Sequence, residues 1–291
     1  MRIVFNIFFL ILFLPLVLSA QQWRYGLKTG LNFARIKGPS ETINGADLES
    51  WKNTTGFHVG MALDYEWTDR FGIRSEVIYS KRGGNYTFEG PAYRLFNTPA
   101  GTVRSTGNAK YRLSVNNSYL DIPITGYARL GKLEVSVGAY VGFLVQSTGE
   151  GTLSYTKGIT APPANARIDS LGFVLRHNYR RDDPGEGSGD PVRIRVENYN
   201  VELPGTLGAY YDHKEDRGSL YNAFDYGLIG GASFYLTSSL YVHGRLQYGL
   251  ADVTNNKMDL SRSTLNQDGS LLFRDDKDQN WNITVSIGFK L

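Results

Sequence analysis

One stretch decides the fold: residues 56–67, with the sequence GFHVGMALDYEW. Every second residue, from Phe57 to Trp67, is large and apolar. The residues between them are small, polar or charged, and include His58 and Asp64. Alternation of this kind over about ten residues is typical of a strand that crosses a membrane in a β-barrel, with one face toward lipid and the other toward the interior.

The same alternation recurs on both sides of this stretch, over residues 23–33, 71–80, 119–129, 133–145, 224–236, 240–250 and 281–291. We therefore predict an all-β fold, a transmembrane antiparallel up-and-down barrel of eight strands. In the stretch 119–129 two sets compete for the lipid face, and we assign it to Leu120, Ile122 and Ile124. Pro123 cannot donate to a ladder, so we expect it at a bulge or a locally unpaired position.

The connections are of two kinds. Three tight turns are expected at 68–70, 130–132 and 237–239, and four long loops at 34–55, 83–118, 146–221 and 251–279. Outer-membrane barrels have short periplasmic turns and long extracellular loops, so an even number of strands leaves both termini in the periplasm. A soluble barrel would place its apolar faces inside. It would also not need aromatic residues near the strand ends, such as Trp67, Phe71, Tyr127 and Tyr241.

The third loop, 146–221, carries an alternative of ten strands. Leu171, Phe173 and Leu175 could pair with the segment 192–197 across the charged connection at 182–185. The apolar faces are only about three residues long, too short to cross a bilayer. A hairpin that projects above the membrane is the preferred interpretation.

The amino terminus and the composition indicate export. Arg2 followed by the apolar run 3–18 and by Ser19-Ala20 is typical of a cleaved secretory signal peptide over residues 1–20, which leaves 21–291 as the barrel domain. Cysteine is absent, which excludes disulfides and thiolate metal sites. A net charge of +3 gives no electrostatic reason to expect nucleic acid.

Four segments resemble the PorT-like outer-membrane β-barrel domain family: YGLKTGLN at 25–32, GFHVG at 56–60, YLDIPI at 119–124 and FDYGLIGG at 224–231. The resemblance covers most of the mature chain, and the order of the segments is more specific than any one of them. It implies a fold and an outer-membrane location, and for some relatives an association with protein secretion. It carries over no catalytic residues.

Alternation also predicts a charged barrel interior. The inward charged residues are Arg24, Lys28, Arg74, Arg245 and Lys290 against Asp64, Glu66, Glu76, Glu134 and Asp225. An eight-stranded barrel is just wide enough to be filled by side chains, and buried charges are tolerated when they pair. We interpret this set as structural, a filled polar core. A narrow path for ions or small solutes through the same residues is the alternative.

Little in the sequence indicates catalysis or a cofactor, and we expect neither a catalytic residue nor a metal. His58 and His243 point inward, and no Ser–His pair faces lipid, as a lipid-modifying enzyme would need. Asp212, His213 and Asp216 could serve a protease at the rim, but solvated loop residues are the simpler interpretation. Calcium ligands could come from Asp275, Asp276, Asp278 and Asn280 in the last loop, but a solvated acidic loop is favoured, because the spacing does not match a calcium-binding loop.

The hypothesis that follows is a non-enzymatic outer-membrane barrel whose large loops serve binding or an outer-membrane protein assembly, with a channel or an enzyme as alternatives. Loops carry function when the scaffold beneath them is rigid. Its expected partners are outer-membrane lipid, lipopolysaccharide and other envelope proteins. Basic pairs expected at or beyond the outer rim, where lipopolysaccharide phosphates lie, are Lys81-Arg82, Arg180-Arg181 and Arg193 with Arg195.

Overall fold

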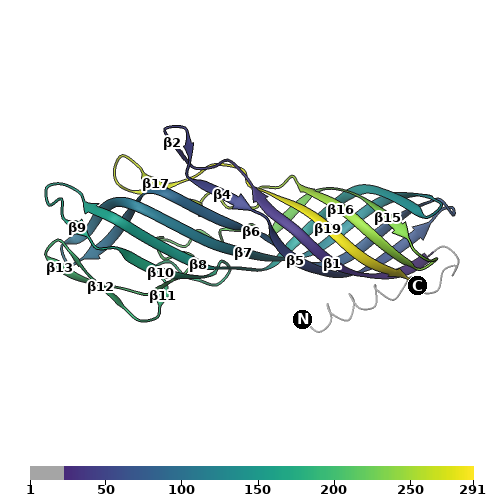
Figure 1. Cartoon of the computed structure of the whole chain (residues 1–291), viewed down its shortest axis with the longest axis horizontal. Helices are drawn as coiled ribbons and strands as arrows, with labels where there is room; N and C mark the ends of the chain where they lie inside the picture. Colours follow the sequence, from purple (N-terminus) through teal and green to yellow (C-terminus); the bar gives the residue numbers. More distant parts are fainter. Residues whose placement is uncertain (1–22) are drawn as a thin grey trace.

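The computed structural model describes residues 23–291, so the predicted signal peptide, residues 1–20, lies outside the described residues. The described chain forms a barrel of eight strands, with further strands continuing from one end of it (Figure 1). The barrel strands are β1 (Trp23–Lys37), β5 (Thr54–Glu66), β6 (Phe71–Thr98), β7 (Gly101–Leu130), β8 (Leu133–Thr160), β15 (Phe224–Tyr235), β16 (Leu240–Gly249) and β19 (Gln279–Lys290).

Each barrel strand pairs antiparallel with the one before and after it, and β1 closes the barrel by pairing with both β5 and β19. At the closing seam Leu27 lies between Met61 of β5 and Phe289 of β19. The prediction of eight antiparallel strands is therefore confirmed. Within residues 23–291, no helix is long and apolar enough to span a membrane.

The outward face of the barrel is apolar around its circumference. Met61, Val137 and Ile287 are 63%, 70% and 60% exposed, and each lies between two less exposed residues in the sequence. The aliphatic assignment on β7 is confirmed, since Ile124 is 56% exposed. Tyr127 and Tyr241, which also lie near strand ends, are buried inside the barrel, on the face opposite the lipid-facing residues.

Pro123 lies in a short gap in the ladder between β6 and β7. Pairing stops at Ser75–Ile124 and resumes at Ile78–Asp121 in the same register, while Pro123 stays opposite Tyr140 of β8. A proline without an N–H causes this interruption. The position is locally unpaired, as predicted, and it is not a bulge.

The predicted loop 83–118 is wrong, because β6 and β7 continue through it as one hairpin with a two-residue turn at Pro99-Ala100. Gly101, with a φ of 124°, ends this turn in a conformation that favours glycine. The inward face of β6 changes character along its length. Arg74 and Glu76 lie on it within the barrel, whereas Phe88 and Phe96 lie on it farther along, 0% and 1% exposed.

We call the part of the molecule beyond the lipid-facing band the distal region: residues 36–53, 83–118, 146–221 and 251–278. Its buried apolar residues form one cluster, which includes Ile36, Phe88, Val115, Leu153 and Met258. Its smaller strands are β2 (Thr42–Ile43), β3 (Ala46–Asp47), β4 (Glu49–Lys52), β9 (Arg167–Ile168), β10 (Leu171–Asn178), β11 (Gly187–Ser188), β12 (Val192–Val196), β13 (Tyr199–Leu203), β14 (Thr206–Leu207), β17 (Leu260–Leu265) and β18 (Leu271–Phe273). In Figure 1 this region extends the barrel away from the chain's C-terminal end.

The third long connection folds differently from the predicted hairpin. β10 pairs with the continued β8, and β12 pairs with β13, so 171–175 and 192–197 are not partners. The sheet of the distal region is open, and it ends at β4 on one side and at β11 on the other. The apolar side chains of both stretches are buried in the distal cluster and do not face lipid. Neither stretch therefore needs the length of a strand that crosses a bilayer.

Candidate functional site

Glu76 lies at the centre of the charged barrel interior. Its carboxylate accepts hydrogen bonds from Lys28 Nζ, at 2.6 Å, and from Arg245. The three side chains are buried and come from β6, β1 and β16, so the contacts cross the barrel. A buried carboxylate with two cationic partners has the compensation that burial of charge requires.

A second group of charges lies nearer the tight turns. Arg74 binds Asp64 with two hydrogen bonds, at 2.6 and 3.0 Å, and Glu134 with a third, at 2.8 Å. Lys290 Nζ lies 2.8 Å from Asp64 and 2.6 Å from Glu66. Arg24 lies at the rim, where its side chain is 52% exposed, and its Nε is 3.0 Å from Glu66 Oε2.

Arg82 was expected at the outer rim, and that prediction was wrong. It is buried at 1% exposure inside the barrel, with Nη2 2.9 Å from Asp121 and 3.2 Å from Asp225. Its guanidinium lies 4.0 Å from the ring centroid of Tyr119. A Cβ added to Gly142 would lie 2.5 Å from Asp121 Oδ1, so that glycine leaves room for the pair. The even spacing from Arg74 to Arg82 was the signal in the sequence for this inward position.

His58 also lies inside the barrel, where it connects two polar side chains. Its Nδ1 is 2.7 Å from Asn32 Oδ1, and its Nε2 is 2.8 Å from Ser286 Oγ. A serine, a histidine and a group that orients the ring form the order used by nucleophilic hydrolases. The adjoining space is only about 10 Å³, room for about one water. An acyl substrate does not fit there, so the contacts act as part of the polar core.

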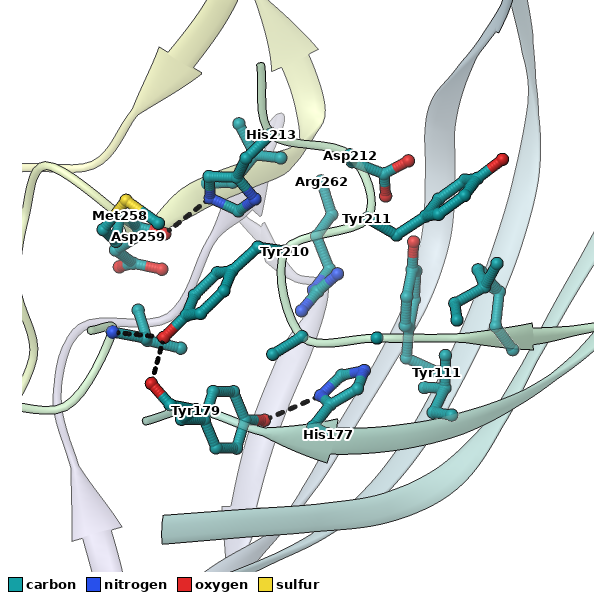
Figure 2. Close-up of a pocket in the computed structure, with 17 residues that line it drawn as sticks. Tyr111, His177, Tyr179, Tyr210, Tyr211, Asp212, His213, Met258, Asp259 and Arg262 are labelled. Atoms are coloured by element: carbon teal, nitrogen blue, oxygen red, sulfur yellow. Dashed lines mark hydrogen bonds between the residues drawn. The ribbon is translucent and has the colours of Figure 1, made fainter. Parts of the chain in front are cut away.

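The distal region holds a larger cavity, of about 60 Å³, that sequence analysis did not identify (Figure 2). Segments far apart in the chain line it: Tyr111 of β7, Leu153 of β8, His177 of β10, the stretch 207–213 and Arg262 of β17. Aromatic rings pack edge to face at its base, with Tyr179 and Tyr210 at 6.4 Å between centroids. The cavity is thus built by the fold and has no local sequence motif.

Arg262 lies at the middle of this cavity. Its guanidinium lies 4.1 Å from the ring centroid of Tyr111, and its Nε donates to Tyr86 Oη at 3.2 Å. Figure 2 shows the guanidinium among Tyr111, Tyr210 and His177. We call the group of Arg262, Tyr111, Tyr210, His177 and His213 the distal pocket.

The two histidines of the distal pocket are held in their neutral form. Burial, with the positive charge of Arg262 adding to it, lowers the pKa of His177 to about 3. Burial also lowers the pKa of His213. His177 Nδ1 lies 2.9 Å from Tyr179 Oη, and His213 Nε2 bonds the Met258 carbonyl at 3.1 Å. A neutral imidazole has one N–H donor and one acceptor nitrogen, so both rings keep hydrogen-bonding capacity toward the cavity.

Comparison with known proteins gives the family. The sequence profile of the outer membrane protein beta-barrel domain matches residues 19–255, most of the chain. The chain belongs to this family. Its location is therefore the bacterial outer membrane. No curated protein matches this outer-membrane barrel.

Among solved structures, the chain is similar to several outer-membrane proteins at low identity. Ail, the attachment invasion locus protein of Yersinia pestis, is 10% identical, with 93% of this chain and 100% of Ail covered and a TM-score of 0.33. OprG from Pseudomonas aeruginosa is 10% identical, with 93% and 96% covered and a TM-score of 0.34. Neisserial surface protein A is 9% identical, with 92% and 97% covered and a TM-score of 0.30. Scores this low support no functional argument.

The protease candidates of this outer-membrane barrel do not form a catalytic group. Asp212 pairs with Arg94 Nη1 at 2.9 Å, and His213 bonds a backbone carbonyl. Asp216 is exposed and accepts from the Gly218 backbone N–H. The interpretation of these three as solvated loop residues holds for Asp216 and is wrong for Asp212 and His213, which are half-buried.

The acidic residues of the last connection separate into different environments. Asp275 is exposed, whereas Asn280 points into the barrel and donates to Asp225 at 2.9 Å. Asp276 and Asp278 meet Asp259, with carboxylate oxygens within 4.8 Å of one another. The prediction of a solvated loop is wrong for Asp278, which is 7% exposed.

Arg274 supplies the positive charge in this acidic cluster. It pairs with Asp276, bonds Glu49 at 2.7 Å, and lies 3.8 Å from Asp259. Burial, with Asp276 adding to it, raises the pKa of Asp278 to about 6. An arginine among the carboxylates makes this an ion-pair cluster of the distal region.

Proposed function

We propose that this chain is a non-conducting, non-enzymatic outer-membrane barrel that carries a preformed binding region beyond the lipid. The observation that carries the proposal is the continuation of β6, β7 and β8 into the distal region, where they enclose an apolar core and the distal pocket. Rigid strands beneath a concave, aromatic pocket with a few polar groups are typical of a ligand site.

The filled interior supports the absence of conduction. Ion pairs join non-adjacent strands at Glu76 and between Arg74 and Glu134, and the cavity near His58 has a volume of about 10 Å³. An ion path would need a continuous water column, which these contacts occupy. The folded protein in a planar bilayer is expected to give no stable single-channel steps. Regular steps that persist after purification to one species would show that the channel alternative is correct.

The orientation is part of the proposal. The three tight turns lie at the end opposite the distal region, and outer-membrane barrels place short turns in the periplasm. The distal region would then face outside, both termini would be periplasmic, and residues 1–20 would be removed on export. Protease added to intact cells is expected to cut between 182 and 191, in the charged connection before β12. Cutting only after the outer membrane is opened would reverse the orientation.

We also propose lipopolysaccharide and envelope proteins as the surroundings of the distal region, in line with the PorT-like resemblance and its link to secretion. Arg180, Arg181 and Arg193 are exposed there and can contact phosphate groups. Charge reversal of Arg180 and Arg181 to Glu is expected to weaken binding to vesicles that contain lipopolysaccharide. The same reversal at Arg70, in a tight turn, is the matched control, and equal effects at both ends would contradict the proposal.

A further inference from the structure

Arg262 is half-buried, and its partners differ from those of three buried arginines of this chain. Arg74, Arg82 and Arg94 each contact a carboxylate at 3.2 Å or less. The Arg262 side chain contacts Tyr86 and Tyr111, and no carboxylate of residues 23–291 lies within 4.0 Å of its guanidinium. Glu41 does contact Arg262, but its carboxylate accepts a hydrogen bond from the Arg262 backbone N–H and not from the guanidinium.

Aromatic contacts compensate only part of this charge. The attraction of a cation to an aromatic face is smaller than the cost of moving an ion fully out of water. Of the five N–H donors of a guanidinium, the Nε–H is used by Tyr86. The Nη groups have no acceptor among the described residues, and Arg262 lines the cavity. The pocket therefore has unused cationic donors beside empty space.

One neighbouring group can add a donor to the guanidinium. His177 can accept from Tyr179 Oη at its Nδ1 and then keeps an Nε2–H to donate, whereas His213 donates its Nε2–H to the Met258 carbonyl and its unpartnered Nδ1 is an acceptor. Two carboxylates also line the cavity: Asp212 is paired with Arg94, and Asp259 lies 3.8 Å from Arg274, which it shares with Glu49 and Asp276. Arg262 is the one arginine or lysine that lines this cavity, and among the described residues its guanidinium has no carboxylate partner.

We propose that the distal pocket binds the oxyanion group of a small ligand, a carboxylate, sulfate or phosphate, with the Arg262 guanidinium as its anchor. Guanidinium groups bind such oxyanions through paired N–H donors, which gives geometry as well as strength. A cavity of about 60 Å³ fits one oxyanion group, and the rest of the ligand would extend along the tyrosine rings. This inference rests on the proposed binding function and names its ligand class.

Calorimetric titration of the full chain in detergent tests the proposal with three probes, sodium benzoate, sodium sulfate and sodium phosphate, in chloride buffer. At least one probe is expected to bind. Arg262→Gln should weaken that binding about tenfold or more, because it removes the charged hydrogen-bond donors that anchor the oxyanion. Arg193→Gln, an exposed arginine elsewhere in the distal region, should leave it unchanged. Preference for benzoate indicates a carboxylate ligand, and preference for sulfate or phosphate a tetrahedral one.

Two outcomes overturn the inference: none of the three probes binds the wild-type chain, or Arg262→Gln binds as well as wild type. If Arg262→Gln fails to fold, as judged by heat-modifiable gel mobility, Ala209→Leu serves instead. It narrows the cavity and keeps the arginine, so it should also weaken binding. If the binding test fails, the proposed function is still open to its own tests, because conduction and surface exposure are measured separately.

Discussion

Strand β6 passes through both regions of the molecule, and its inward face meets two different interiors. Within the lipid-facing band that face carries Arg74, Glu76 and Arg82, and the opposite face carries apolar residues such as Val77. In the distal region the same face carries Phe88 and Phe96, and polar residues point outward. Lipid covers the outside of one part and water the outside of the other, so each part places its apolar side chains where its own surroundings require them.

The difference teaches that the two regions are stabilised by different forces. The barrel interior depends on paired charges, and the distal interior on apolar burial. Substitutions at matched positions of the two regions should therefore have opposite outcomes, and they provide the tests below.

The largest effect is expected from Arg74→Met in the barrel interior. It leaves Asp64 and Glu134 buried without their main partner, which should cost about 3–5 kcal/mol of unfolding free energy. Urea titration followed by heat-modifiable mobility measures the loss. Arg24→Met, at the exposed rim, should cost less than about 1 kcal/mol. Equal costs at both positions would mean that burial of the pairs is unimportant.

Phe88→Ala should disturb the distal region with a local loss of about 3–5 kcal/mol, since its side chain is 0% exposed. We expect faster hydrogen exchange in 83–118 and 146–221, with unchanged mobility of the barrel on gels. Thr87→Ala, the next residue on the outer face, is the matched control. Unfolding of the barrel together with the distal region would show that the two regions form one cooperative unit.

An arginine introduced on the outward face of β7 should show whether that part of the strand is surrounded by lipid or by water. Ile124→Arg, in the lipid-facing band, should cost roughly 2–4 kcal/mol, as charged residues near a bilayer midplane do. Ser114→Arg lies on the same face of the distal region, beside Glu150, and should change stability by less than about 0.5 kcal/mol. Unfolding titrations in lipid vesicles give both values. A cost at Ser114 as large as that at Ile124 would place the distal region in lipid.

The smallest effect concerns pH. The folded pKa of Asp278 is raised from 3.8 to about 6, mainly by burial, so folding disfavours its ionised form. Stability of the distal region should be highest below about pH 4 for this group, and should fall as pH rises to about 6, by on the order of 2 kcal/mol. Asp278→Asn should flatten this slope in hydrogen exchange measured from pH 4 to 7. Asp275→Asn, at an exposed position, should retain the slope, and a steeper slope in Asp278→Asn would reverse the assignment.

The sequence was sufficient for the barrel because each strand carries its own alternation. Leu27, Met61 and Ile124 face lipid for a reason visible in their neighbours, and the inward positions of Arg74 and Glu76 follow by parity. The same parity continues through Arg82 to Phe88, but there the apolar face turns inward, so a search for outward apolar residues ends too early. The alternation was present, and the solvent on each side of it was the missing information.

The distal pocket could not be predicted in the same way. Arg262 meets Tyr111 across about half of the chain, through pairing of β8 with β10 and packing of the last connection onto β6. No local pattern marks an arginine that lacks a carboxylate partner. Asp276 and Asp278 illustrate the same limit, because Asp259 joins them only after the chain has folded.

The open sheet of the distal region ends at β4 and β11, which have four and two residues. An unpaired strand edge is a template on which another chain can add a strand, and longer edges offer more hydrogen bonds to it. Neighbouring copies crowded in one membrane would meet at such edges more often than copies free in solution. Strands this short offer a neighbouring molecule few backbone hydrogen bonds, so β4 and β11 are poor templates for joining the distal sheets of adjacent copies.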